Sequence, residues 1–141
     1  MPTTLINVLV VDDHPAVRAG LRALIDAQDD MQAVGEASDG FTLSPAIRRL
    51  DPALILLDYQ MPGTNGLELC RRIKARTPAP RVVIYSSFVA ATMAIPARIA
   101  GADALVDKGV PPRELAATIR AVMQGEAIPI AVMPPAVRQN I

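Results

Sequence analysis

The sequence predicts an α/β fold: a doubly wound, five-stranded parallel sheet with strand order 2-1-3-4-5 and helices on both faces. Three observations lead to this prediction. Short apolar runs alternate five times with segments of helical period. The runs are apolar on both faces, as strands of a covered parallel sheet are. Each run is followed by a helical segment, and right-handed crossovers then place helices on both sides of the sheet.

The expected strands are short and aliphatic, and several stop abruptly at a polar residue. They span residues 5–11, 31–37, 53–57, 81–85 and 102–106. The first ends at Asp12, the third at Asp58 and the fourth at Ser86. A loop is expected after the third strand, because Pro-Gly and Asn-Gly pairs follow there.

The expected helices repeat apolar residues every three or four positions. They span residues 14–28, 39–50, 67–76, 90–100 and 112–124. Pro15 falls in a first turn, where the amide hydrogen that it lacks would have no partner. The segment 90–100 is the least regular, because Pro96 interrupts it and Arg98 is its only charge. We hypothesise that residues 88–100 are partly covered by a partner, by the tail or by a second copy of the chain. The alternative is an Ala-rich helix that is short or irregular.

Composition narrows the function further. The 141 residues are 51% hydrophobic with no Trp, so one domain with an aliphatic core is expected over residues 1–125. Residues 126–141 are Pro-rich and are interpreted as a tail or the start of an interdomain linker. Fourteen basic and fourteen acidic residues balance, so no net charge attracts DNA to this chain. No secretory signal or membrane span is expected, and a single cysteine, Cys70, is compatible with the cytoplasm.

Polar side chains gather where the expected strands end. Asp12 and Asp13 follow the first strand, Asp58 the third, Ser86 the fourth, and Lys108 comes just after the fifth. Ligands of doubly wound sheets bind at the carboxyl ends of the strands, so we expect these side chains to converge. Carboxylates that crowd together need a cation, and their hard oxygens suit Mg2+.

The same cluster suits phosphoryl chemistry. Lys108 offers a positive charge and Ser86 a hydroxyl donor to phosphoryl oxygens. A carboxylate beside a metal can attack phosphorus and form an aspartyl phosphate. Asp58 is the expected nucleophile, because it alone of the three acids ends a central strand without an adjacent acid.

Five motifs in order give a specific resemblance. They are VVDDH at 10–14, LDYQMPG at 57–63 with Asn-Gly at 65–66, Ser86, Gly-Ala at 101–102, and Lys108. Over residues 5–125 the chain resembles the receiver domain of two-component response regulators, which has the flavodoxin-like topology of the chemotaxis receiver. DDHP at 12–15, MPGTNGLE at 61–68 and the segment 114–126 are similar to receivers that precede a LuxR-type helix-turn-helix domain.

The resemblance implies a phosphoacceptor that is switched by a sensor histidine kinase, not a turnover enzyme. Asp58 would accept the phosphoryl group, Ser86 would move toward it and Lys108 would pair with it. Mg2+ would be held by Asp12, Asp13, Asp58 and the backbone carbonyl of Gln60. The fourth helix, fifth strand and fifth helix would carry the signal to a transcriptional output.

The resemblance also implies the partners. DNA would be bound only through an output domain absent from this chain. A homodimer is possible through the first and fifth helices or through residues 88–100.

One residue departs from the family's pattern, and two alternative functions remain open. Leu105 stands where the family usually has Tyr or Phe, so the coupling of Ser86 to the surface is expected to differ. The chain could be a degenerate receiver that docks or dimerises without phosphorylation. An aspartate-nucleophile phosphatase is disfavoured, because that class has an Asp-x-Asp pattern after its first strand. His14 is interpreted as a first-turn residue and not as a metal ligand.

Overall fold

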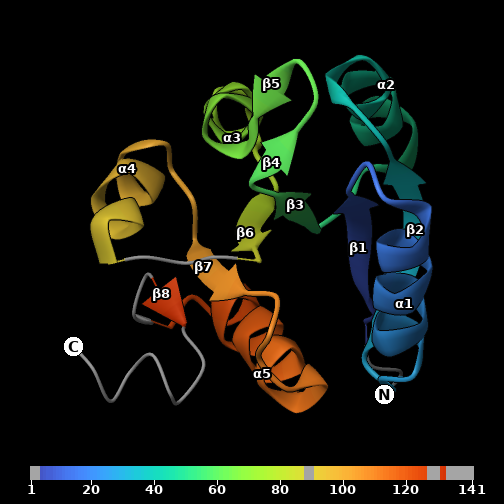
Figure 1. The fold of residues 1–141 in the computed structure, drawn as a ribbon. Helices are drawn as coiled ribbons and strands as arrows, with labels where there is room; N and C mark the ends of the chain where they lie inside the picture. Colours follow the sequence, from blue (N-terminus) through green and yellow to red (C-terminus); the bar gives the residue numbers. More distant parts are fainter. Residues whose placement is uncertain (1–3, 88–90, 127–130, 133–141) are drawn as a thin grey trace.

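The computed structural model describes residues 4–87, 91–126 and 131–132 (Figure 1). Its main sheet has six parallel strands in the order β2-β1-β3-β6-β7-β8. Their bounds are β1 Ile6–Val11, β2 Met31–Ala37, β3 Leu54–Asp58, β6 Arg81–Ser86, β7 Ala104–Asp107 and β8 Ala131–Val132. The five predicted strands are therefore confirmed, and so is their order.

Helices cover both faces of this sheet, as predicted. They are α1 Pro15–Asp26, α2 Gly40–Leu50, α3 Gly66–Lys74, η1 Ala91–Met93, α4 Ala94–Ile99 and α5 Pro112–Met123. Figure 1 shows α2, α3 and α4 on one side and α1 and α5 on the other. Successive residues of β3 alternate between the two cores: Ile55 and Leu57 face α2 and α3, whereas Leu54 and Leu56 face α1 and α5. All four are fully buried.

Two short elements were not predicted. A two-stranded antiparallel hairpin, β4 (Gln60–Met61) and β5 (Thr64–Asn65), replaces the expected loop after β3. The strand β8 adds to the edge of the sheet, with Ala131 opposite Leu105 and Val132 opposite Val106. Runs of two residues show no period, so sequence patterns do not reveal them. The interpretation of residues 126–141 as a tail or linker stays a prediction.

The segment expected to be a helix over 90–100 is divided into η1 and α4. Helix α4 begins at Ala94, so Pro96 lies in its first turn, where the missing amide hydrogen breaks no helical bond. Ile95 and Ile99 are 71% and 74% exposed. Residues 88–90 lie outside the described residues, and the hypothesis that this region is covered stays a prediction.

No helix within the described residues is long and apolar enough to cross a membrane.

Candidate functional site

The predicted site residues come together at the carboxyl edge of the sheet. Asp12 follows β1, Asp58 and Ser86 are the last residues of β3 and β6, and Lys108 follows β7. Because the strands are parallel and adjacent, their ends meet at one edge. Asp12, Asp58 and Ser86 are buried, at 0%, 3% and 4% exposure. A cluster of buried polar groups therefore closes one end of an otherwise aliphatic core.

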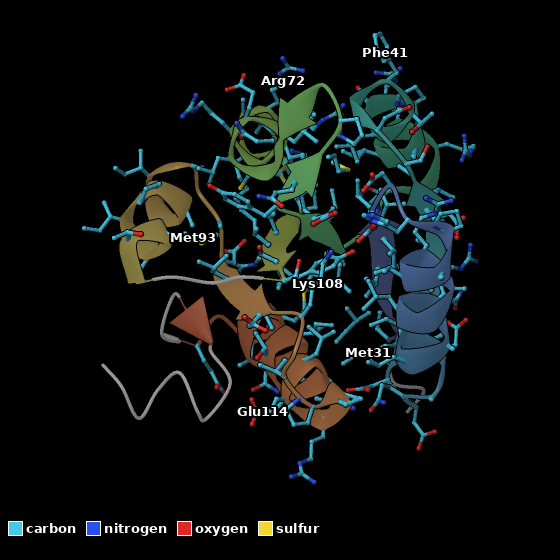
Figure 2. The ribbon with its side chains drawn as sticks, in the orientation of Figure 1. Met31, Phe41, Arg72, Met93, Lys108 and Glu114 are labelled. Carbon is cyan, nitrogen blue, oxygen red and sulfur yellow. The ribbon has the colours of Figure 1, made fainter. Side chains whose placement is uncertain are left out.

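Lys108 bridges the two buried carboxylates. Its Nζ lies 3.3 Å from Asp12 Oδ2 and 3.2 Å from Asp58 Oδ1. The same ammonium lies 4.9 Å from the centre of the Tyr85 ring, within the range of a cation–π contact. Figure 2 labels Lys108 next to β7, and its side chain is 22% exposed. The structure thus fixes one positive charge between two negative ones.

Asp12 is held by a network that the sequence did not predict in full. The hydroxyl of Tyr85 donates to Asp12 Oδ2 at 2.9 Å, and the backbone N–H of His14 donates to Oδ1 at 2.7 Å. Burial alone would raise the pKa of Asp12, but these hydrogen bonds outweigh it and hold that pKa below its usual value. Burial beside Asp12 raises the pKa of Tyr85, so its hydroxyl stays a donor.

Asp58 has the opposite balance. Burial raises the pKa of its carboxyl group, and Lys108 opposes the shift without cancelling it. The nearby negative charge of Asp12 adds to the increase. The backbone N–H of Gln60 donates to Asp58 Oδ1 at 3.3 Å, so the main chain of Gln60 lies beside this carboxylate. Of the two carboxylates that Lys108 bridges, Asp58 is therefore the one whose charge is less compensated.

A third carboxylate completes a set that fits a hard cation. One ligand atom from each of Asp12, Asp13, His14 and Asp58 lies within 4.8 Å of the others. The buried Oδ1 of Asp13 accepts no hydrogen bond from the described residues, although His14 Nδ1 is 3.1 Å away. That nitrogen also lies 3.0 Å from Asp12 Oδ1, and one ring N–H cannot serve both oxygens. An oxygen-rich cluster with an unsatisfied carboxylate is the donor set that Mg2+ prefers.

His14 itself is the N-cap residue of α1 and is 64% exposed at its side chain. Its position agrees with the prediction of a first-turn residue.

The turn after Asp58 is closed by Gly66. Its N–H donates to the carbonyl of Tyr59 at 2.7 Å, and Asn65 caps α3 by accepting a hydrogen bond from Glu68 N. A Cβ on Gly66 would lie 2.7 Å from the Asp58 carbonyl oxygen and 2.8 Å from Tyr59 Cα. These neighbours are backbone atoms and cannot swing away. Gly66 therefore lets α3 begin against the strand that positions Asp58.

Gly66→Ala is expected to lower the free energy of unfolding by about 1–3 kcal/mol, the usual cost of overpacking. Gly20→Ala is the matched control, because Gly20 lies in α1 and a Cβ there meets nothing within 4 Å. The control is expected to raise stability by about 0.5–1 kcal/mol, since alanine costs less backbone entropy in a helix. Urea unfolding followed by circular dichroism measures both. Equal stabilities for the two variants would contradict the assigned contact.

Ser86 and Leu105 lie in neighbouring strands. Ser86 is opposite Asp107 in the pairing of β6 with β7, and its carbonyl accepts a hydrogen bond from Lys108 N at 2.7 Å. Leu105 is fully buried and belongs to the core beneath α4, with Ala97 and Ala100. The structure places both where the sequence predicted, but their roles in switching stay predictions.

Comparison with known proteins gives a consistent result. The family model of the response regulator receiver domain matches residues 8–120. The chain is 37% identical over 122 residues to the transcriptional regulatory protein LiaR of Bacillus subtilis, covering 86% of this chain and 58% of that protein. It is 33% identical over 135 residues to the nitrate/nitrite response regulator protein NarL of Escherichia coli, covering 96% and 62%. The chain thus spans little more than half the length of these relatives.

A solved structure agrees over almost its whole length. It is a two-component response regulator of the LuxR family from Aurantimonas sp. SI85-9A1, 32% identical, with a TM-score of 0.85. The match covers 96% of this chain and 94% of that one. The two chains therefore share one fold over almost their full lengths.

Proposed function

Because the chain belongs to the response regulator receiver family, we propose that it is the phosphoacceptor module of a two-component signalling system. In this proposal a sensor histidine kinase is the phosphoryl donor and Asp58 is the acceptor. The observation that carries the proposal is the placement of Lys108 Nζ, 3.2 Å from the buried carboxylate of Asp58. The ammonium can stay paired with Asp58 while it meets a phosphoryl oxygen.

The transfer is a displacement at phosphorus. An oxygen of the ionised Asp58 carboxylate forms the new P–O bond as the P–N bond of the kinase phosphohistidine breaks, and the histidine nitrogen keeps the electron pair. Asp12, Asp13, Asp58 and the carbonyl of Gln60 would hold Mg2+, which when bound neutralises charge on the phosphoryl oxygens. Tyr85 and His14 hold Asp12 in place through their hydrogen bonds.

The added group then acts as the signal. A phosphoryl group adds about −1.5 to −2 charges and three acceptor oxygens at one carboxylate. Ser86 and Lys108 respond to it and bias a surface formed by α4, β7 and α5 between two states. Leu105, which is fully buried in β7, replaces the family's usual aromatic residue in this coupling.

The output in the proposal is transcription, as the name of LiaR indicates for that protein. DNA is contacted through an output domain outside this chain, and a cytoplasmic homodimer is the proposed assembly. The chain receives a phosphoryl group and is not proposed to be a turnover enzyme. A phosphorylation-independent docking role is the alternative, and no described contact favours it over the phosphoacceptor.

The test is the intact mass after incubation with acetyl phosphate, a small phosphodonor. We expect one added phosphoryl group in the presence of Mg2+ and none when the metal is chelated. Asp58→Ala should stay unlabelled, whereas the matched control Asp29→Ala, at an exposed position far from the site in sequence, should be labelled like the parent. Labelling of Asp58→Ala, or no labelling of the folded parent chain, would count against the phosphoacceptor and favour the docking role.

A further inference from the structure

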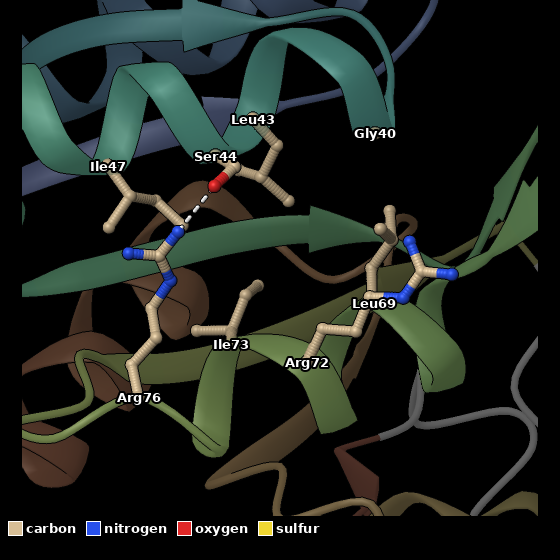
Figure 3. A pocket seen from close by; sticks show the side chains of 8 residues that line it. All are labelled: Gly40, Leu43, Ser44, Ile47, Leu69, Arg72, Ile73 and Arg76. Atoms are coloured by element: carbon tan, nitrogen blue, oxygen red, sulfur yellow. Dashed lines mark hydrogen bonds between the residues drawn. The ribbon is translucent and has the colours of Figure 1, made fainter.

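Two guanidinium groups converge on one hydroxyl in the groove between α2 and α3. Ser44 Oγ accepts hydrogen bonds from Arg76 Nη2 at 2.6 Å and from Arg48 Nη1 at 3.0 Å. Figure 3 shows the Arg76 side chain reaching from the end of α3 to Ser44 on α2. A hydroxyl oxygen has two lone pairs, so both are used and its proton remains to be donated. Three donors thus gather at one point on this surface.

The two positive charges lack a negative partner. Within residues 4–87, 91–126 and 131–132, no carboxylate oxygen lies within 4.0 Å of the Arg48 or Arg76 guanidinium. The nearby Glu68 is already paired with Arg71 and Arg72. Two like charges held on a neutral oxygen repel each other, and an anion between them would remove that repulsion.

One carboxylate, that of Asp51, lies near Arg48 and Arg76. Asp51, the C-cap residue of α2, lines an adjoining cavity together with Arg48 and Arg76. It lies beyond ion-pair distance of both, since neither pair comes within 4.0 Å. The balance beside Ser44 is therefore two cations against one distant acid.

A cavity of about 250 Å³ with a mixed apolar and polar lining lies beside Ser44 and Arg76. The α2 side is lined by Leu43, Ser44 and Ile47 and the α3 side by Leu69 and Ile73, and the guanidinium groups of Arg76 and Arg72 lie toward opposite ends (Figure 3). Drug-sized ligands occupy cavities of roughly 300–1,000 Å³, so this cavity suits a smaller molecule. Aliphatic side chains beside guanidinium groups match a small ligand that has an apolar body and an anionic head.

We propose that this groove binds a small organic phosphate, with its phosphate held by Arg48, Arg76 and Ser44 and its apolar body between α2 and α3. Arginine suits this role, because its planar group donates two parallel hydrogen bonds to phosphate oxygens. The site is separate from the acidic cluster at the carboxyl edge, and the inference does not depend on phosphorylation of Asp58.

The test is an NMR titration of the arginine side-chain N–H signals with two probes, phenyl phosphate and inorganic phosphate. EDTA and constant ionic strength keep metal binding and screening out of the comparison. Saturable shifts are expected at Arg48 and Arg76. Phenyl phosphate should bind at least about tenfold more tightly than inorganic phosphate, because its ring is removed from water.

Arg48→Gln and Arg76→Gln should each weaken phenyl phosphate binding about tenfold or more. The matched control is Arg49→Gln, an exposed arginine of the same helix that, within the described residues, makes no hydrogen bond to Ser44, and it should bind like the parent. Arg48 is itself exposed, so Arg48→Gln tests the site even where Arg76→Gln disturbs the packing of α3. Non-saturating shifts, equal affinity for the two probes, or parent-like binding by Arg48→Gln would overturn the proposal.

Discussion

Asp13→Ala is expected to weaken Mg2+ binding at least about tenfold to a hundredfold, because changes to outer ligands alone cost that much. The buried Oδ1 of Asp13 accepts no hydrogen bond from the described residues, so the carboxylate serves the fold little. The metal-free variant should therefore unfold at a urea concentration close to that of the parent chain. Titration calorimetry with Mg2+ measures the loss directly.

Asp29→Ala is the control for Asp13→Ala, since Asp29 is exposed and lies in the turn between α1 and β2. It should bind Mg2+ like the parent chain. Unchanged Mg2+ affinity in Asp13→Ala would contradict the assignment of this residue as a ligand.

Asp58→Asn is expected to stabilise the metal-free chain. Burial penalises the ionised carboxylate, Asp12 repels it, and Lys108 compensates only in part, so the pKa of Asp58 is raised. Removal of this incompletely compensated charge should therefore raise the free energy of unfolding at neutral pH, while Lys108 keeps Asp12 as an ionic partner. The gain should appear at neutral pH in EDTA as a higher urea concentration at the midpoint of unfolding. With Mg2+ present, the midpoints of the variant and the parent chain should lie closer together.

Asp12→Asn is the informative comparison, because the two acids have opposite pKa shifts. The hydrogen bonds from Tyr85 and His14 favour the ionised form of Asp12. Its replacement should lower stability by about 1–3 kcal/mol, the cost of weakening hydrogen bonds to a buried charge. If both variants are destabilised equally, the charge of Asp58 is as well compensated as that of Asp12. That result would contradict the opposite directions of their pKa shifts.

Most of the acidic cluster was predictable, because it depends on the carboxyl ends of adjacent strands. Apolar runs located the strands, and Asp12, Asp58 and Lys108 follow from where those runs stop. Parallel pairing then brings the ammonium group of Lys108 within 3.3 Å of both Asp12 and Asp58, which are far from it in sequence. Where both faces of a parallel sheet are buried, polar residues at the carboxyl ends of the strands are strong candidates for a binding site.

The missed features depend on side-chain direction or on very short elements. The predicted strand 81–85 includes Tyr85, and a buried phenol needs a hydrogen-bond partner, but the sequence does not indicate that this partner is Asp12. The arginine pair on Ser44 joins residues 32 positions apart across two helices, and helical period does not fix that contact. The strand β8 is two residues long and shows no pattern at all.

The position of the phosphoryl group is the most direct measure of whether Asp58 is the acceptor. After treatment with acetyl phosphate and Mg2+, borohydride reduces an aspartyl phosphate to homoserine, and tryptic peptides then locate that residue by mass. We expect homoserine at Asp58, in the peptide that begins after Arg49. Homoserine at Asp12 or Asp13 in place of Asp58, or at no aspartate of a folded chain, would contradict the assignment.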